Sequence, residues 1–370
     1  MAKNKAPIGT GHLGHRETIA LLIIAIASRL FLGLPRIMAT VGGTAGWLVV
    51  TIAFGAALLG FLLLDLLLAR FPGDDLLGIA RRIVGPFAPA VGLILFLFLL
   101  ATVSLVTREF AEIFIVGILP RTPIGVVGGL LLVLLVFASY MGLETISRLA
   151  ILYAPYLLLF LSLIYVLVLP NASLLNLAPL WGSGLSRMAL PGLARSAVFA
   201  EIVLLGFFAP QLRETRRRRT VGFLSLVGSY LIFLVTTLVY SMVFDYPGTT
   251  GIFFPVFQMA RLISIVEFIQ RIEAVFIFIW FFSAVIGMAA VFFTAAYIYA
   301  RTFGLATHRP LLFPLAVVVY GLSLLPGSFS TAVRLDADYV RLYAWGPAFV
   351  LPGVLLILAV LRGQKGTNAH

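Results

Sequence analysis

The feature that most limits the fold of this chain is a succession of long apolar blocks, such as ALLIIAIASRLFLGL from residue 20 and LILFLFLLATVSLV from residue 93. A helix needs roughly 20 predominantly apolar residues to cross a hydrocarbon layer ~30 Å thick. Only helices and closed barrels satisfy their backbone polar groups in lipid. Barrel strands alternate polar and apolar residues, which these blocks do not. The sequence therefore predicts an all-α integral membrane protein.

The composition agrees with lipid as the main solvent. Of the 370 residues, 62% are hydrophobic and 11% are charged, whereas globular domains carry about 25% charged residues. The chain has no cysteine, which excludes disulfides, thiolate metal sites and a cysteine nucleophile. The first apolar stretch lacks a small-residue cleavage pattern, so we expect this helix to be retained.

We predict about ten transmembrane helices in a single domain. Residues 17–169 form a first repeat and residues 193–361 a second, between cytoplasmic tails at 1–16 and 362–370. Residues 74–85 are predicted to form a short amphipathic connecting helix, whereas residues 171–190 are expected to be irregular. The predicted spans are 17–40, 44–70, 86–119, 123–142, 146–169, 193–211, 220–244, 269–301, 310–328 and 339–361.

Lysine and arginine favour an orientation with both termini in the cytoplasm, because these residues are retained on that side. The densest run, RETRRRR at 213–219, lies between the sixth and seventh spans. This run is typical of an inner-leaflet anchor that attracts anionic lipid; a docking site for a protein is the alternative. The net charge of +12 therefore requires no nucleic-acid partner.

Two spans carry helix-breaking residues at matching positions in the two repeats. Span 1 contains Gly33-Leu34-Pro35, and span 6 contains Gly206 and Pro210. Proline removes a backbone donor and glycine tolerates unwound geometry. Interrupted segments at corresponding positions indicate an inverted-repeat transporter with a site at mid-membrane. The alternative is that these residues only kink their helices.

The order of four motifs resembles the spore-germination permease family. The motifs are GLPR at 33–36, GTAGW at 43–47, FAE at 199–201, and RIE at 271–273 leading to Trp280. Members of this family are the B subunits of germinant receptors in endospore-forming bacteria. The family belongs with the amino acid, polyamine and organocation transporters, so the resemblance implies a five-plus-five inverted repeat with broken helices 1 and 6.

The resemblance also implies a ligand site, partners and a location. The ligand would be a small germinant such as an amino acid. The partners would be a receptor A subunit and a C lipoprotein, and the membrane would be the spore inner membrane. The implied ligand-binding residues lie on spans 1, 6 and 8 and are Gly33, Leu34, Phe199, Ala200, Glu201, Leu204, Gly287, Ala290 and Thr294.

Two charged residues lie deep within predicted spans. Glu201 is surrounded in sequence by apolar residues, and an intramembrane ionisable group is a functional hypothesis by default. It either titrates with ligand or ion movement, because burial disfavours the charged form, or it holds helices together. For Arg29 three roles stay open: an ion pair with Glu201 or Asp65, the lining of an aqueous cavity, or snorkelling.

Other charged residues are assigned to helix ends. Arg271 and Glu273 begin span 8 and are expected to form a gate or a surface pair. Asp65 is expected to be structural, close to Arg70. A similar network is expected near the outer end of span 3, formed by Arg108, Glu109 and Glu112.

No motif in the sequence indicates an enzyme. The chain contains no phosphate-binding loop, no H-E-x-x-H motif and no clustered metal ligands, so we expect no catalytic residue, cofactor or metal. Two functions remain. The chain is either the membrane subunit of a germinant receptor, or a proton- or sodium-coupled amino acid permease; a scaffold that has lost ligand binding is a third reading.

Overall fold

The computed structural model describes residues 13–263 and 272–366, with the side chains of residues 272–276 left out. Within these ranges the chain is helical and forms no strand; its single isolated bridge joins Leu13 to Leu212. The longer helices are α1 (His15–Ala27), α3 (Gly46–Arg70), α5 (Ala88–Gly117), α6 (Ile124–Met141), α7 (Leu143–Val168), α10 (Arg218–Val243), α12 (Ile272–Thr302), α13 (Leu312–Leu324) and α16 (Leu351–Leu361).

Shorter elements connect or continue these helices. The short α-helices are α2 (Leu34–Gly42), α4 (Leu76–Val84), α8 (Leu185–Ala194), α9 (Leu205–Phe208), α11 (Pro255–Arg261), α14 (Phe329–Arg334) and α15 (Arg341–Tyr343). The 3-10 helices that matter below are η1 (Ser28–Leu32) and η6 (Arg195–Leu204), and the π-helices are η11 (Leu335–Val340) and η12 (Gly346–Val350).

The number of spans agrees with the prediction. Among the described residues, eight segments are long and apolar enough to cross a membrane, and Arg309–Leu324 is a shorter apolar helix. Residues 15–32 complete the set as the first half of broken span 1. The amphipathic helix predicted at 74–85 is α4, whose N-cap Asp75 accepts a hydrogen bond from the Gly78 amide at 2.7 Å.

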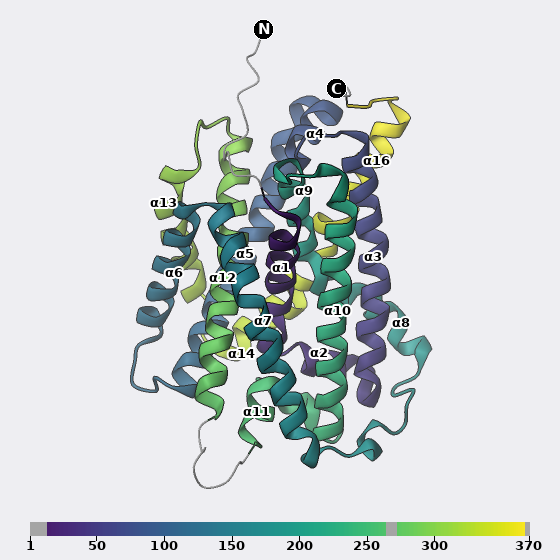
Figure 1. Cartoon of the computed structure of the whole chain (residues 1–370), viewed down its shortest axis with the longest axis vertical. Helices are drawn as coiled ribbons and strands as arrows, with labels where there is room; N and C mark the ends of the chain where they lie inside the picture. The colour runs from purple at the N-terminus through teal and green to yellow at the C-terminus, as the bar shows by residue number, and fades with distance from the viewer. Residues whose placement is uncertain (1–12, 264–271, 367–370) are drawn as a thin grey trace.

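Helix α1 lies at the centre of the bundle (Figure 1). It packs against α7, α10, α12 and η6, and most of its side chains are buried. Helix α5 packs along α12. By contrast, α6 and α7 expose leucine, valine and phenylalanine side chains such as Leu130, Phe137 and Leu159, because their outer faces meet lipid rather than protein.

Both ends of the described chain lie at the same end of the bundle. The Leu13 amide bonds to the Gln211 carbonyl at 2.8 Å, and the Gly366 amide bonds to the Arg70 carbonyl at 2.9 Å. Arg218 begins α10 shortly after Gln211, and its Nε lies 3.1 Å from Asp65, which precedes Arg70 on α3. This ion pair places the contact at Gln211 and the contact at Arg70 at the same end of the bundle. The arginine run at 213–219 therefore shares one end of the bundle with both tails.

Asp65 and Arg70, which were expected to lie close together near the end of span 2, have different partners. Asp65 pairs with Arg218 and, at 3.9 Å, with Arg219, whereas Arg70 donates to the Gln364 carbonyl at 2.6 Å. Residues five apart on an α-helix point in different directions. Asp65 therefore faces α10, while Arg70 faces the C-terminal residues.

The predicted break in span 1 is confirmed. Helix α1 ends at Ala27, a 3-10 turn follows, and Gly33 has φ 109° before α2 begins. Glycine reaches this left-handed conformation without the steric cost of a Cβ atom. A Cβ at Gly33 would also stand 3.2 Å from the Phe253 carbonyl oxygen. Pro35 sits in the first turn of α2, where its missing N–H is tolerated.

The break in span 6 lies earlier than Gly206 and Pro210 indicate. The irregular stretch is η6, which runs from Arg195 to Leu204, and Gly206 falls in the α-helical turn α9. Gly206 serves packing instead, because a Cβ there would lie 3.3 Å from Leu76. Span 6 also begins earlier than predicted, since α8 starts at Leu185 within the segment expected to be irregular.

Span 10 also begins earlier than predicted. Its helical path starts at Phe329 and passes through η11 and η12 before α16. The prediction began at residue 339 because Arg334, Asp336 and Asp338 interrupt the apolar pattern. Asp336 is nevertheless buried in the bundle, where charged partners compensate it.

Candidate functional site

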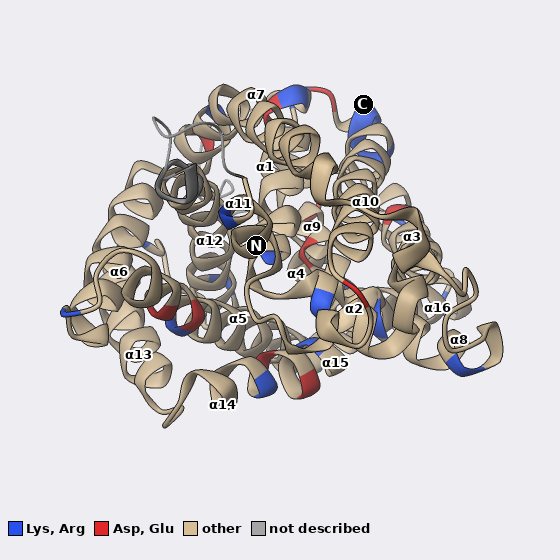
Figure 2. Cartoon of the chain, turned by 90° about the horizontal axis from the view of Figure 1, so that it is seen from below, with Lys and Arg blue, Asp and Glu red and all other residues tan. Residues whose placement is uncertain are grey.

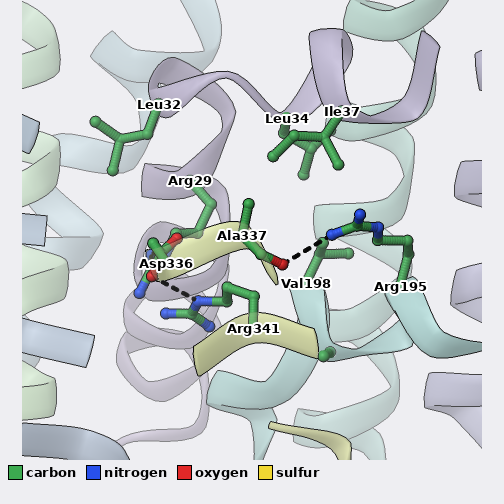
Figure 3. Close-up of a pocket in the computed structure, with 10 residues that line it drawn as sticks. Arg29, Leu32, Leu34, Ile37, Arg195, Val198, Asp336, Ala337 and Arg341 are labelled. Carbon is green, nitrogen blue, oxygen red and sulfur yellow. Dashed lines mark hydrogen bonds and ion pairs between the residues drawn. The ribbon is translucent and has the colours of Figure 1, made fainter. Parts of the chain in front are cut away.

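Four charged side chains meet where the broken segments of spans 1, 6 and 10 come together; we call Arg29, Glu201, Asp336 and Arg341 the charge cluster. Arg29 Nη1 donates to both Asp336 carboxylate oxygens, at 3.1 and 3.2 Å, and Arg29 Nε lies 3.4 Å from Glu201 Oε1. Arg341 Nη1 lies 2.8 Å from the same Glu201 oxygen, and Arg341 Nε lies 3.5 Å from Asp336 Oδ1. Figure 3 shows Arg29 and Arg341 converging on Asp336.

The charge cluster is almost completely shielded from solvent. The exposed fractions are 6% for Arg29, 1% for Glu201, 8% for Asp336 and 6% for Arg341. Removing charges from water costs several kcal/mol per ion unless opposite charges compensate them closely. Each cation in the cluster touches both anions, so the cluster joins η1, η6, η11 and α15 into one electrostatic unit. Figure 2 shows charged segments inside the bundle as well as at its edge.

A fifth charged residue, Glu109 on α5, lies close to the cluster. It is 2% exposed and interacts electrostatically with Asp336 and Arg29, yet it forms no ion pair within 4.0 Å in the part of the chain that the structure describes. The network expected for Arg108, Glu109 and Glu112 is therefore wrong for Glu109. Arg108 and Glu112 pair at 2.9 Å because residues four apart share a helix face, whereas Glu109 faces inward.

A cavity of about 30 Å³ adjoins the cluster. This holds about two water molecules, each of which needs ~10–15 Å³. Arg195 closes one side, because its Nη1 donates to the Ala337 carbonyl at 2.9 Å and its Nη2 lies 3.7 Å from Asp338 (Figure 3). The cavity is lined by Arg29, Leu32, Leu34, Ile37, Arg195, Ala197, Val198, Asp336, Ala337 and Arg341.

One oxygen of the cluster lacks a hydrogen bond. Glu201 Oε2 is buried and has no hydrogen-bond partner among the described residues. A buried acceptor without a donor is costly in free energy. The site can therefore accept a hydrogen from a molecule that supplies a donor at this position.

The predicted ligand residues of spans 1 and 6 fall into two groups. Gly33 forms the break, Leu34 lines the cavity and Glu201 belongs to the charge cluster. The other three, Phe199, Ala200 and Leu204, are buried on η6 and do not line the cavity. Phe199 instead packs against Phe233, with ring centroids 5.3 Å apart.

The predicted residues of span 8 lie along α12. Gly287 permits close packing, because a Cβ there would stand 3.1 Å from Ala25 Cα on α1. The Thr294 hydroxyl donates to the Ala290 carbonyl at 2.7 Å, within the same helix. None of the three lines the cavity. Arg271 and the side chain of Glu273 lie outside the described residues.

Neither Asp336 nor Arg341 was predicted from the sequence to be a site residue. The two residues are five apart, a spacing that separates side chains on an α-helix but brings them near one face in a π-helix with its i to i+5 pattern. The π-helix η11 ends immediately before Arg341. The available signal was the run of four charges of both signs, Arg334, Asp336, Asp338 and Arg341, directly before an apolar block.

Comparison with known proteins identifies relatives over nearly the whole chain. The family model described as "Spore germination protein" matches residues 12–329. "Spore germination protein KB" of Bacillus subtilis (strain 168) is 25% identical over 369 residues, covering 95% of both chains. "Spore germination protein A2" of the same organism is 24% identical and covers 93% of this chain and 96% of its own.

Solved structures show the same fold. MHP1, a nucleobase-cation-symport-1 family transporter in a closed conformation with bromovinylhydantoin bound, superposes with a TM-score of 0.69 at 16% identity. The match covers 95% of this chain and 80% of that one. MhsT in complex with L-phenylalanine superposes with a TM-score of 0.68 at 16% identity, covering 94% and 89%. The predicted inverted-repeat transporter fold with broken helices 1 and 6 is thus confirmed.

The family match and the fold agree with the resemblance carried by the GLPR, GTAGW, FAE and RIE motifs. The relatives and fold neighbours are germination proteins and transporters of integral-membrane type. This chain is therefore a member of the spore germination protein family, with the fold of the inverted-repeat transporters.

Proposed function

We propose that this chain is the membrane subunit of a spore germinant receptor. It binds a small germinant such as an amino acid at the charge cluster and passes the signal to a receptor A subunit and a C lipoprotein in the spore inner membrane. It catalyses no reaction and needs no cofactor. The observation that carries the proposal is the meeting of broken spans 1 and 6 at Arg29 and Glu201, 3.4 Å apart within the membrane.

The chemistry of the cluster suits a zwitterion. Guanidinium groups bind carboxylates in paired, charge-assisted hydrogen bonds, so Arg29 and Arg341 offer partners for a ligand carboxylate. Glu201 Oε2 lacks a donor in the described chain, and a ligand ammonium supplies one. A molecule carrying both groups replaces ion pairs of the cluster with equivalent ones, which limits the cost of desolvation.

Binding requires the cluster to open. A cavity of about 30 Å³ is smaller than the ~300–1,000 Å³ typical of ligand pockets. Ligand entry therefore parts some of the ion pairs between spans 1, 6 and 10, together with the contact of Arg195 to Ala337. This coupling between occupancy and the packing of three spans is what a receptor subunit needs in order to transmit a signal.

The second candidate is a proton- or sodium-coupled amino acid permease. The fold neighbours that favour it are transporters, one of them solved with L-phenylalanine. Both functions use the same site and differ in whether the ligand crosses the membrane. Flux of a bound ligand into proteoliposomes would favour the permease; adjacent genes for an A subunit and a C lipoprotein would favour the receptor.

The direct test is a binding screen on the purified full chain with amino acids, sugars and nucleosides. We expect an amino acid to bind, and Arg341→Gln to weaken its binding while the matched variant Arg108→Gln, outside the cluster, does not. A screen in which no amino acid binds, or in which both variants bind as wild type does, would contradict the proposal.

A further inference from the structure

The buried charges around the cluster do not balance. Arg29 and Arg341 contribute two positive charges, whereas Glu201, Asp336 and Glu109 contribute three carboxylates when all are ionised. An uncompensated charge in a low-dielectric interior is strongly unfavourable, and such a group usually becomes neutral instead. The five residues together therefore call for one additional positive charge.

The pairing geometry selects Glu109 as the group that receives this charge. Asp336 accepts two hydrogen bonds from Arg29, and Glu201 lies within ion-pair distance of both arginines. Glu109 is as buried as these residues but has no cation within 4.0 Å in the described ranges 13–263 and 277–366. Glu109 is therefore the carboxylate that lacks a compensating cation among the described residues.

The neighbouring groups in the described part of the chain do not neutralise Glu109. Arg36 on α2 interacts with it only at longer range, and the Arg36 guanidinium stacks over Phe253 at 4.6 Å. Helix α12 presents Trp280 to Phe110, beside Glu109 on α5. Among the described residues, the charged groups that interact with Glu109 are Asp336 on η11, Arg29 on η1 and Arg36 on α2. Titratable groups elsewhere on described elements packed against α5 are Arg81, Arg82, Tyr140, Tyr297, Tyr299, Arg301, Tyr320, Arg334, Asp338 and Tyr339.

A proton fits this position better than a multivalent metal cation. A bound metal ion needs several converging oxygen ligands. In the described part of the chain, no three His, Asp or Glu side chains come together in a way that could hold one. A proton needs only the carboxylate itself.

We propose that Glu109 is a proton-binding site, held neutral beside the charge cluster at neutral pH and able to exchange its proton when the charges of the cluster change. The neutral Glu109 carboxyl leaves two cations facing two anions. Parting of the ion pairs keeps the net charge of the cluster but moves its charges relative to Glu109, and this change is then matched by release or uptake of one proton at Glu109. This site goes beyond ligand binding and does not depend on it.

Infrared spectroscopy of the purified full chain without ligand tests this site. The sample is kept in a maltoside detergent, which has no carbonyl group to overlap the signal. At neutral pH we expect the C=O stretch of a protonated carboxylic acid in wild type, and loss of this band in Glu109→Gln. The band should persist in Glu112→Gln, the matched control one turn away, and in Glu109→Asp, which restores a carboxyl group. Because glutamine resembles the neutral acid, Glu109→Gln should melt at the wild-type temperature.

Three results would overturn the proposal. The first is a wild-type spectrum without a carboxylic-acid band at neutral pH, and the second is a band that survives in Glu109→Gln. The third is a band that disappears when sodium chloride replaces choline chloride, since the neutralising cation would then be sodium. No ligand is present, so the outcome is independent of the germinant-binding test.

Discussion

At the scale of single residues, Glu201 combines a structural and a ligand-binding capacity. One carboxylate oxygen lies within 3.4 Å of both arginines, and the other is buried without a donor among the described residues. We expect Glu201→Gln to fold, because the amide oxygen can still face Arg341. A charge-assisted hydrogen bond contributes about 1.5–3 kcal/mol, so amino acid affinity should fall roughly 10- to 100-fold.

Calorimetric titration of Glu201→Gln measures this effect. Glu112→Gln serves as the matched control, because Glu112 forms its ion pair with Arg108 outside the cluster. Wild-type affinity in Glu201→Gln from about pH 6 to about pH 9, the range over which a buried carboxyl titrates, would reduce Glu201 to a packing role.

His308 provides a separate residue-scale prediction outside the membrane spans. Its ring is 5% exposed, packs on Phe293 at 4.7 Å, and has no hydrogen-bond partner at either nitrogen in the described chain. Burial lowers the pKa of His308 from 6.5 to about 4. Between these values the unfolded chain takes up a proton that the folded chain does not, so stability is lost as the pH falls through this window.

Replacing His308 should remove this acid sensitivity. Melting temperatures measured from about pH 7 to about pH 4.5, the window set by the ordinary and native pKa values of histidine, should fall less in His308→Leu than in wild type. His15→Leu, which changes the histidine at the start of α1, should keep the wild-type slope. An equal slope in His308→Leu and wild type would show that His308 is not the sensing group.

At the scale of elements, the π-helix η11 explains how span 10 contributes to the site. It carries Asp336, and its Ala337 carbonyl accepts from Arg195 of η6 at 2.9 Å. This contact closes the cavity between spans 6 and 10. We therefore expect that parting of η6 from η11 exposes Arg29 and Arg341.

Loss of Arg195 should favour the open arrangement. In this cysteine-free chain, a cysteine introduced at Ile37, in the cavity wall, can be labelled from outside with an impermeant thiol reagent. We expect Arg195→Gln to speed labelling roughly tenfold, since a hydrogen bond to a charged group contributes about 1.5–3 kcal/mol. The control Arg187→Gln alters an exposed arginine of α8, and equal rates in the two variants would refute a latch at Arg195.

The same elements show which parts of the fold and of the site can be predicted from the sequence. Apolar block length predicted the spans, because lipid solvation demands it, and the Gly33-Pro35 pair located the break in span 1. Span 10 was predicted too short because Arg334, Asp336 and Asp338 interrupt the apolar pattern, and Asp336 was therefore missed. The ion pairs of Asp336 and Arg341 with Arg29 and Glu201 come from distant parts of the chain, and a π-helix gives no periodic signal. Glu109 could not be separated from Arg108 and Glu112 for the same reason: tertiary packing decides which face is inside.

At the scale of the whole molecule, the shared end of both tails and the 213–219 run should be cytoplasmic. Single cysteines at Thr215 and Lys365, both exposed, should resist an impermeant reagent added outside intact cells. A cysteine at Asn171, in the exposed connection after α7, should react. Labelling of Thr215→Cys or Lys365→Cys from outside would overturn this orientation.

The central claim is that the unwound backbone of span 1 forms part of a ligand site. Gly33→Leu tests it, because leucine opposes the left-handed conformation and fills the space 3.2 Å from the Phe253 carbonyl. Gly142→Leu is the control: Gly142 also has a positive φ, 94°, and no atom lies within 4 Å of its Cβ position, so it places leucine at a positive φ away from the site.

The decisive measurement is titration of wild type, Gly33→Leu and Gly142→Leu, each purified and folded, with the amino acid that binds wild type most tightly. We predict that Gly142→Leu binds as wild type does and that Gly33→Leu shows no binding at ligand concentrations 100-fold above the wild-type Kd, a loss of roughly 3 kcal/mol or more. Wild-type affinity in folded Gly33→Leu would contradict the broken-helix site and the receptor function built on it.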